Sequence, residues 1–336
     1  MSFWSGRYVA VTGGASFIAS HLIDALVARD VHVVAIDDLS LGRLEYLKPH
    51  LDAGTVEFVS ANLMYLTQAH SALQGAEIVF HLAAQHGGRG FVDREQARTA
   101  QNFGIDATVF QACLDVKVER IFYASSGCVY PLFLQYDPKN VHRLAEEMVG
   151  PPYEPDNVYG HAKLAGELTL RALHAAYGIK VSIGRFFTVY GERSYPSHAV
   201  TAMIARARMR QDPFVVWGDG SQVRNWTHVS DIVTGMLLAA ERIEDATAVN
   251  LGTEEATRVI DAVRLILDHA WFHPVIALRP DLPTGPLARV ADVARARERL
   301  GWTPQVCFAD GVRRMADWYF ETYSPDEARA AIATHG

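Results

Sequence analysis

Short runs of hydrophobic residues alternate with longer amphipathic segments through the first half of the chain. Runs with the length and apolar character of buried β-strands lie at 7–12, 31–37, 55–60, 77–83 and 120–125. Segments in which apolar side chains recur at the spacing of an α-helix lie at 16–29 and 96–115. Buried strands that alternate with helices indicate a parallel sheet covered on both faces. The pattern therefore predicts an α/β fold, namely a Rossmann-like, doubly wound parallel sheet.

The second half of the chain is less regular. Residues 126–158 are rich in Pro and Tyr and are predicted to be irregular, followed by a helix at 159–177 and a sixth strand at 179–186. Shorter helices are predicted near 198–210, 230–241, 256–269 and 308–322, and short strands near 214–217 and 223–227. We predict that residues 1–190 form the sheet domain, that 191–325 form mainly a smaller, substrate-binding lobe with some segments returning to the sheet, and that 326–336 form a tail.

Composition narrows the class of protein. A chain of 336 residues exceeds the usual size of a single core, which suits a sheet domain with an appended lobe. A net charge of -7 gives no general attraction to nucleic acid or to anionic membranes. No apolar run approaches the ~20 residues that cross a bilayer. Cys113, Cys128 and Cys307 lack the spacing of a disulfide framework or a zinc site. We expect a cytoplasmic protein without metal and without a nucleic-acid or membrane partner.

The stretch "AVTGGASFIASHL" joins the first strand to the first helix. Free N–H groups at the start of such a helix bind phosphate, and glycines let the backbone approach it closely. Gly13 keeps the first of the three spaced glycines of a dinucleotide-binding turn, while Ser16 and Ala19 occupy the other two positions. Asp37 and Asp38 end the second strand, where a carboxylate accepts hydrogen bonds from ribose hydroxyls and repels a 2′-phosphate. These features favour NAD over NADP as the cofactor.

A tyrosine and a lysine four residues apart suggest the chemistry. Tyr159 and Lys163 share one face of the predicted helix, so Lys163 can hold the nicotinamide ribose and lower the pKa of Tyr159. A phenol that ionises near neutral pH is a general base for a sugar hydroxyl, and Ser126 at the end of the fifth strand can share that hydrogen bond. The predicted NAD-binding residues are Gly13, Ser16, Phe17, Ile18, Asp37, Asp38, Asn62, Leu63, Leu82, Ala83, Ala84, Tyr159 and Lys163.

With these motifs the chain resembles the extended short-chain dehydrogenase/reductase family, specifically its nucleotide-sugar epimerases and dehydratases. The resemblance runs from about residue 7 to residue 322 and includes the Tyr159–Lys163 pair, "TGGASFIASHL", "DDLSLGR", "HLAA", "GRFFTVYG", "WGDGSQVRNWTHVSDIV" and "RERLGWTP". It implies that bound NAD oxidises the sugar at C4, that the 4-keto intermediate is rearranged, and that the same hydride returns. It also implies a homodimer that pairs through the helices at 96–115 and 159–177.

Cys128 distinguishes the branches of this family. In the similar 4,6-dehydratases an Asp-Glu pair follows the catalytic Ser or Thr, whereas this chain has Gly-Cys there. In the branch that inverts C3 and C5 the corresponding Cys is an acid/base residue, and His198 falls where that branch has a Lys. The resemblance therefore favours C3/C5 inversion, although Cys128 as an inert buried side chain and His198 as a surface residue remain open. A C4-epimerase, which needs only Ser126, Tyr159, Lys163 and NAD, is the main alternative, followed by a dehydratase or a net oxidoreductase.

Arginines are expected at the nucleotide end of the substrate, because guanidinium groups bind diphosphates well. Arg224 and Arg289 match family positions that clamp the diphosphate, and Arg185 ends the sixth strand near them. Gly88 and Arg89 lie in the loop "QHGGRGF", which resembles the C3/C5-inverting branch. The expected substrate is a nucleoside-diphosphate sugar, and its predicted contacts are Gly88, Arg89, Ser126, Arg185, Arg224 and Arg289.

Overall fold

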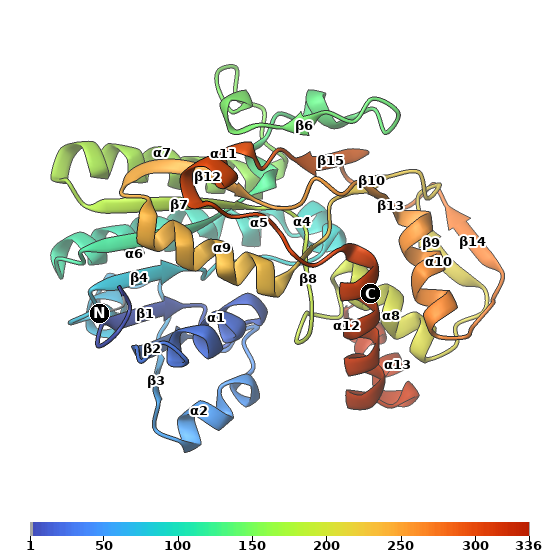
Figure 1. Ribbon diagram of the computed structural model, residues 1–336, viewed down its shortest axis with the longest axis horizontal. Coiled ribbons are helices and arrows are strands. Elements are labelled where there is room, and N and C mark those ends of the chain that lie inside the picture. Colours follow the sequence, from blue (N-terminus) through green and yellow to red (C-terminus); the bar gives the residue numbers. More distant parts are fainter. Residues whose placement is uncertain (1–2, 336) are drawn as a thin grey trace.

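A seven-stranded parallel sheet forms the core of the larger part of the molecule, at the left of Figure 1. The computed structural model describes residues 3–335. The strand order is β12-β7-β5-β4-β1-β2-β3, and every neighbouring pair is parallel. The strands are β1 (Tyr8–Thr12), β2 (His32–Asp37), β3 (Val56–Ser60), β4 (Ile78–His81), β5 (Arg120–Ser126), β7 (Lys180–Phe186) and β12 (Asp245–Leu251). The chain reverses direction across the sheet between β1 and β4, which is where open parallel sheets bind ligands.

Helices cover both faces of this sheet. One face packs against α1 (Phe17–Val27), α2 (Lys48–Asp52), α9 (Val229–Arg242) and α11 (Ala294–Leu300). The other packs against α3 (Leu66–Leu73), α6 (Gln101–Asp115) and α7 (Asn157–Tyr177). Successive residues of a strand point to opposite faces, so Val9 and Val11 join one core while Ala10 joins the other. Burial on both faces explains why the strands are continuously apolar in sequence.

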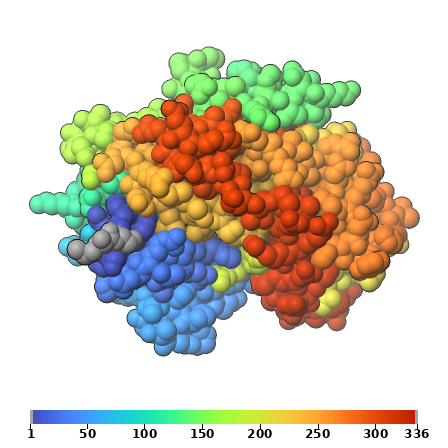
Figure 2. Space-filling model, in the orientation of Figure 1, coloured from blue at the N-terminus to red at the C-terminus, as the bar shows by residue number. Residues whose placement is uncertain are grey.

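A smaller lobe packs against the sheet domain, and Figure 2 shows the two parts sharing one continuous surface. Its hydrophobic cluster joins α8 (Ala199–Arg208), α10 (Val259–His269), α12 (Phe308–Thr322), α13 (Pro325–His335) and β9 (Phe214–Trp217), which pairs with β14 (Ile276–Arg279). A four-stranded sheet contains β13 (Thr257–Arg258), β10 (Val223–Arg224), β15 (Ala288–Ala291) and β6 (Arg143–Leu144). The remaining elements are β8 (Val189–Tyr190), β11 (Thr227–His228), α4 (Arg89–Arg94), α5 (Gln96–Thr99) and the short turns η1 (Leu44–Tyr46), η2 (Gly127–Val129), η3 (Leu132–Gln135) and η4 (Glu146–Met148).

Most predicted elements lie where the sequence pattern placed them. The parallel α/β sheet is confirmed, and each of its six predicted strands lies within two residues of its predicted bounds. The seventh strand, β12, was not predicted, because its sequence "DATAVNL" mixes polar and small residues with apolar ones. The domain limits stay a prediction, since α9, β12 and α11 come from the second region and pack on the sheet. The predicted tail forms most of α13, whose Ala328 is buried, and residue 336 lies outside the described residues.

Three further properties concern residues 3–335. None of their helices combines the length and the apolar character needed to cross a membrane. They contain no cluster of three or more His, Cys, Asp or Glu side chains that is arranged to hold a metal ion. Cys113, Cys128 and Cys307 are free thiols.

The carboxyl ends of the central strands bring polar side chains to one edge of the sheet. Thr12, Asp37, His81 and Ser126 are the last residues of β1, β2, β4 and β5. The helix α1 begins after a four-residue turn that follows β1, and α7 returns beside β5. This edge therefore collects the predicted cofactor and catalytic residues.

Candidate active site

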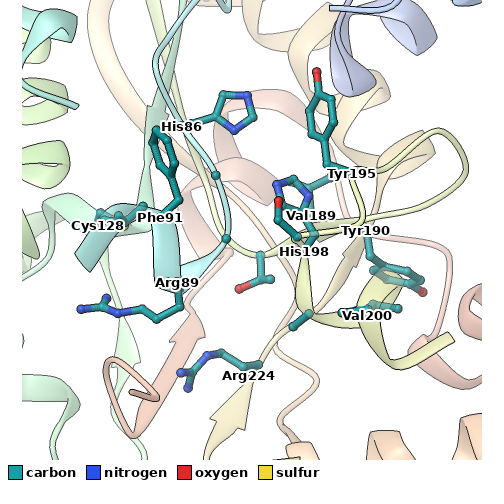
Figure 3. A pocket seen from close by; sticks show the side chains of 18 of the residues that line it. His86, Arg89, Phe91, Cys128, Val189, Tyr190, Tyr195, His198, Val200 and Arg224 are labelled. Carbon is teal, nitrogen blue, oxygen red and sulfur yellow. The ribbon is translucent and has the colours of Figure 1, made fainter. Parts of the chain in front are cut away.

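Two adjoining cavities lie between this edge of the sheet and the lobe. The larger has a volume of about 720 Å³ and the smaller about 100 Å³ (Figure 3 shows a close view of a pocket). Both are lined by Ser16, Leu41, Leu82, Ala84, His86 and Tyr195. Every residue predicted to bind the cofactor or the substrate, or to act in catalysis, lines one of these cavities, with the exception of Arg185.

Gly13 shapes the wall of the smaller cavity. Its φ of +67° favours glycine, and a Cβ at this position would lie 3.0 Å from the main chain of Ala83. Ser16 precedes α1 in an extended conformation, and its side chain makes no capping hydrogen bond. Ala19 is fully buried, so its methyl group is accommodated where the usual turn has glycine. The turn therefore keeps the close backbone approach that a pyrophosphate requires.

Asp37 lies beside this turn at the end of β2. Its Oδ2 accepts a hydrogen bond from the N–H of Ala15 at 3.1 Å, and its Oδ1 accepts one from Leu39 at 2.8 Å. Burial raises the pKa of Asp37, and these two donors partly offset the rise. The smaller cavity is also lined by Asp38, Asn62, Leu63, Leu82, Ala83 and Ala84. Because Gly13 has no side chain, the turn leaves space that fits the pyrophosphate of NAD. The carboxylate of Asp37 at the end of β2 fits a ribose of the same cofactor.

The first turns of α7 carry Tyr159 and Lys163. Lys163 is 2% exposed, and its Nζ lies 4.7 Å from the ring centre of Tyr123 and 5.9 Å from that of Tyr159. Burial raises the pKa of Tyr159, and the Ser126 hydroxyl opposes the rise only in part. The predicted lowering of the pKa of Tyr159 by Lys163 is therefore not observed in this structure.

A buried carboxylate that the sequence analysis missed lies behind Lys163. Asp106, on α6, accepts a 2.5 Å hydrogen bond from Tyr123 Oη and lies 3.0 Å from His81 Nε2. The Nδ1 of His81 lies 2.7 Å from Thr12 Oγ1, so these contacts reach back to β1. Burial lowers the pKa of Lys163, and the charge of Asp106 opposes that effect. No local sequence pattern marks Asp106, because its partners come from other strands and helices.

Cys128 lies in η2, directly after β5. Arg289 on β15 donates a hydrogen bond from Nη1 to Cys128 Sγ at 3.2 Å. The same guanidinium donates from Nε to Gln135 at 2.7 Å and from Nη2 to Asp156 at 2.9 Å. The predicted diphosphate residue Arg289 is thus also bound to the predicted acid/base residue Cys128.

Arg224, on β10, is a cation without a carboxylate partner among residues 3–335. It donates to the main-chain carbonyls of Val223 and Thr284, each at 2.8 Å. Burial, together with repulsion from Arg289 and Arg89, lowers the pKa of Arg224 to about 9. Arg224 therefore remains charged at neutral pH. It lines the larger cavity, where its charge can bind an anionic ligand.

The loop with Gly88 and Arg89 forms another part of the wall. A Cβ at Gly88 would collide with the carbonyl oxygen of Ser197, so only glycine fits here. Arg89 donates to Asp93 at 2.5 and 2.8 Å and to Asp156 at 2.9 and 3.1 Å. The charge of Arg89 is therefore largely balanced within the protein.

The structure corrects the prediction for Arg185. Its guanidinium binds both carboxylate oxygens of Glu167, at 2.9 and 2.8 Å, and is 2% exposed. It also donates to Tyr130 Oη at 3.2 Å and to the carbonyl of Glu146 at 3.0 Å. Arg185 is a structural cation in the sheet domain, and it does not line the substrate cavity.

Two histidines line the larger cavity. Figure 3 shows His198 and Cys128 on opposite sides, with His86 near His198. The rings of His86 and His198 are 6.1 Å apart, and His198 Nδ1 lies 3.0 Å from Ser194 Oγ. Although both rings keep part of their surface open to the cavity, removal from bulk water lowers the pKa of His198 to about 3 and of His86 to about 4. We expected His198 to exchange protons near pH 7, but a pKa of about 3 keeps its ring neutral at that pH. The only indication of His86 in the sequence was its place in the loop "QHGGRGF", two residues before Gly88.

This arrangement defines a class of enzyme. A parallel sheet with a dinucleotide-binding turn, a Tyr–Lys pair on one helix and an adjoining cavity with cationic walls is typical of short-chain dehydrogenases/reductases that act on a second bound ligand. Residues 9–252 match the NAD dependent epimerase/dehydratase family. The chain belongs to this family, and NAD is its cofactor.

Individual relatives cover nearly the whole chain. GDP-mannose 3,5-epimerase of Arabidopsis thaliana is 29% identical over 328 residues, which cover 96% of this chain and 85% of that protein. An uncharacterised UDP-glucose epimerase of Bacillus subtilis is 31% identical over 314 residues, which cover 90% of this chain and 95% of that one. The structure of UDP-glucose 4-epimerase with UDP-glucose from Thermotoga maritima is similar with a TM-score of 0.84 and 27% identity, covering 94% of this chain and 99% of that chain.

Proposed function

We propose that the protein is a nucleoside-diphosphate-sugar epimerase that inverts C3 and C5 of the sugar by way of a transient ketone at C4. The observation that carries the proposal is the placement of Cys128 and His198 on opposite sides of the cavity that also contains Tyr159 (Figure 3). A ketone at C4 acidifies the protons at C3 and C5, and inversion of a carbon requires proton removal from one face and return on the other.

Bound NAD supplies reversible hydride acceptance at C4. Among the protein's own residues, Tyr159 removes the proton of the C4 hydroxyl, and Ser126 shares the hydrogen bond. Lys163 holds the cofactor ribose, and the charge of Asp106 behind it favours the protonated ammonium. The neutral rings of His198 and His86 form one side of the sugar site, opposite the thiol of Cys128.

The nucleotide end is assigned to the arginine cluster. Arg224 offers an unbalanced positive charge, and Arg89 and Arg289 stand nearby around Asp156. A diphosphate beside Arg224 would supply the missing anion, and guanidinium groups suit such a ligand. The relatives named for GDP-mannose and UDP-glucose support the same class of substrate.

C4 inversion is the second candidate, because the similar structure with a TM-score of 0.84 is that of a UDP-glucose 4-epimerase. That reaction needs Ser126, Tyr159 and Lys163 and a cavity in which the ketone can present its other face. A volume of about 720 Å³ leaves room for such a rotation. In this case Cys128 and His198 would only shape the cavity.

A panel of GDP- and UDP-sugars incubated with the protein and NAD in heavy water separates the two reactions. We expect NMR to show deuterium at C3 or C5 of at least one sugar, and Cys128→Ser to slow this exchange while leaving reduction and oxidation at C4 detectable. A product inverted at C4 without deuterium at C3 or C5 would establish the second candidate. If the absorbance of reduced cofactor instead rises as NADH accumulates, the protein is an oxidoreductase.

The proposal includes a cytoplasmic homodimer. The outer surfaces of α6 and α7 expose the large apolar side chains Phe103, Leu168 and Tyr177, of which Tyr177 is 69% exposed. Burial of these side chains against a second copy would follow the family arrangement through these two helices. Light scattering of the purified protein should give twice the mass of the chain, and a monomer would contradict this part of the proposal.

A further inference from the structure

The thiol of Cys128 has a fixed cationic partner. Arg289 is 9% exposed, and its Nη1 donates to Cys128 Sγ at 3.2 Å. Its other two nitrogen groups are anchored by Gln135 at 2.7 Å and Asp156 at 2.9 Å. Because a planar guanidinium that is held at three points cannot turn away, the charge of Arg289 remains directed at the sulfur atom.

The charges around the sulfur atom favour an anion there. Cys128 is surrounded by Arg289 on β15, Arg224 on β10, Asp156 before α7 and Tyr159 on α7. Burial alone would lower the pKa of Arg289, but Cys128 and Asp156 outweigh burial and raise it. Burial alone would raise the pKa of Asp156, but Arg289 and a second guanidinium outweigh burial and lower it. The sulfur atom therefore lies among two guanidinium groups, those of Arg289 and Arg224, and one carboxylate, that of Asp156.

We propose that Arg289 holds the side chain of Cys128 as a thiolate facing the sugar site, which makes Arg289 a positioning residue for proton transfer as well as a neighbour of the diphosphate. The proposal rests on the proposed C3/C5 inversion. The thiolate takes a proton from the carbon beside the C4 ketone, so the C–H bond breaks, an S–H bond forms and the electron pair passes to the enolate oxygen. A solvent-derived proton delivered from the His198 side then inverts the carbon, and the thiol returns its proton to solvent.

The experiment measures the alkylation of Cys128 by iodoacetamide across a range of pH, with each cysteine followed separately by peptide mass spectrometry. Only a thiolate reacts at an appreciable rate. Cys307 is exposed and serves as an internal reference, whereas Cys113 is buried and should not react in the folded protein. No sugar nucleotide is needed for this measurement.

Three variants make the test specific. Removal of a cation within hydrogen-bond distance by Arg289→Gln should raise the pH midpoint of Cys128 alkylation by about 1 unit or more, so that the reaction is about tenfold slower at pH values below both midpoints. Asp156→Asn removes the competing carboxylate and should shift the midpoint in the opposite direction. Arg224→Gln removes a cation of the same cluster that makes no bond to the sulfur, so its effect should be smaller than that of Arg289→Gln. The Cys307 midpoint should not change in any variant.

An unchanged midpoint in Arg289→Gln, or shifts of the same sign in Arg289→Gln and Asp156→Asn, would overturn the proposal. If Arg289→Gln does not fold, Asp156→Asn decides the matter, because failure to speed the alkylation of Cys128 contradicts the charge balance on which the proposal depends. Alkylation as expected in a protein that turns over no sugar nucleotide would count against the proposed function and not against the role of Arg289.

Discussion

Individual side chains in the cavity differ in how much of their charge remains available to a ligand. Arg89 and Arg289 both bind the carboxylate of Asp156, whereas Arg224 donates only to main-chain carbonyls. A buried guanidinium without a carboxylate forms its strongest hydrogen bonds with whatever anion enters. Arg224 is therefore the first contact to test for the diphosphate.

Replacement of Arg224 by Met should weaken substrate binding with little effect on the chemical step. The loss of a charge-assisted hydrogen bond of about 1.5–3 kcal/mol corresponds to a KM that is roughly 10- to 150-fold higher. Arg224→Lys keeps a charge and should recover part of the affinity. Steady-state kinetics on the sugar nucleotide identified in the panel measures both variants, and a KM equal to that of the native protein would show that the diphosphate binds elsewhere.

Tyr159→Phe should lower turnover strongly and preserve the fold. Removal of the only phenol proposed as a general base should lower kcat by about 10²–10⁴-fold. Calorimetric titration with NAD should still give a measurable affinity, because the turn at Gly13 and the carboxylate of Asp37 are unchanged. Tyr153→Phe alters an exposed tyrosine and is the matched control. Activity that persists in Tyr159→Phe would remove this residue from the reaction.

The lowered pKa values of His198 and His86, about 3 and about 4, predict a loss of stability in acid. Above the ordinary histidine pKa of 6.5, the folded and unfolded chains both hold these rings neutral. As the pH falls below 6.5, the unfolded chain takes up protons that the folded chain does not, so the free energy of unfolding decreases. Urea denaturation at several pH values should show a shallower decrease for His198→Asn than for the native protein. His273→Asn, at an exposed histidine, is the control variant.

The residues that sequence analysis identified belong to local patterns. Gly13, Asp37, Tyr159 and Lys163 were found because a turn, a strand end and a helix face each fix their surroundings within a few residues. The partners of Arg289 were not foreseen, and Arg185 was misplaced, because ion pairs between distant segments depend on how the chain folds. His86 and Asp106 were missed because their contacts also come from distant segments, His86 from Tyr195 and His198, and Asp106 from His81.

Among the helices and strands, α7 combines the catalytic pair with close packing against its neighbours. It presents Tyr159 and Lys163 to the cavity, and the following turn packs against β5 and α6. Gly166 lies at this contact, where an added Cβ would collide with Tyr123 Oη and would come within 3.0 Å of Asp106 Oδ2. The close approach of α7 to β5 and α6 thus requires glycine at position 166.

Gly166→Ala should therefore destabilise the protein and disturb the catalytic pair. Overpacking of a well-packed contact typically decreases the free energy of unfolding by about 1–3 kcal/mol. Gly150→Ala is a suitable control, since no atom would lie within 4 Å of its Cβ. Chemical denaturation of both variants gives the comparison, and equal stabilities would show that α7 shifts without strain.

Across the whole molecule, the chain crosses between its two parts more than once. The sheet receives its last strand, β12, only after the chain has passed through α8 and β9 of the lobe. The helices α9 and α11, which cover one face of the sheet, also come from the second region. The periodicity of the first 190 residues predicted the sheet well, whereas the return of later segments is a long-range property that periodicity does not record.

A fragment of residues 1–190 should not fold by itself. It lacks β12 and two helices that bury one face of the sheet, so apolar side chains on that face, such as that of Phe122, would meet water. We expect the fragment to aggregate or to show no cooperative thermal transition by circular dichroism. Coexpression with residues 191–336 should restore a folded complex. A stable, cooperative fragment would support residue 190 as a true domain boundary.

The late arrival of β12 also has a consequence for synthesis of the protein. While a ribosome extends the chain beyond β7, the edge of that strand has no partner until residues 245–251 have emerged. At about 5–20 residues per second, this interval lasts several seconds. During that time the nascent chain presents an open hydrogen-bonding edge to other chains, and early protection by chaperones would increase the yield of correctly folded protein.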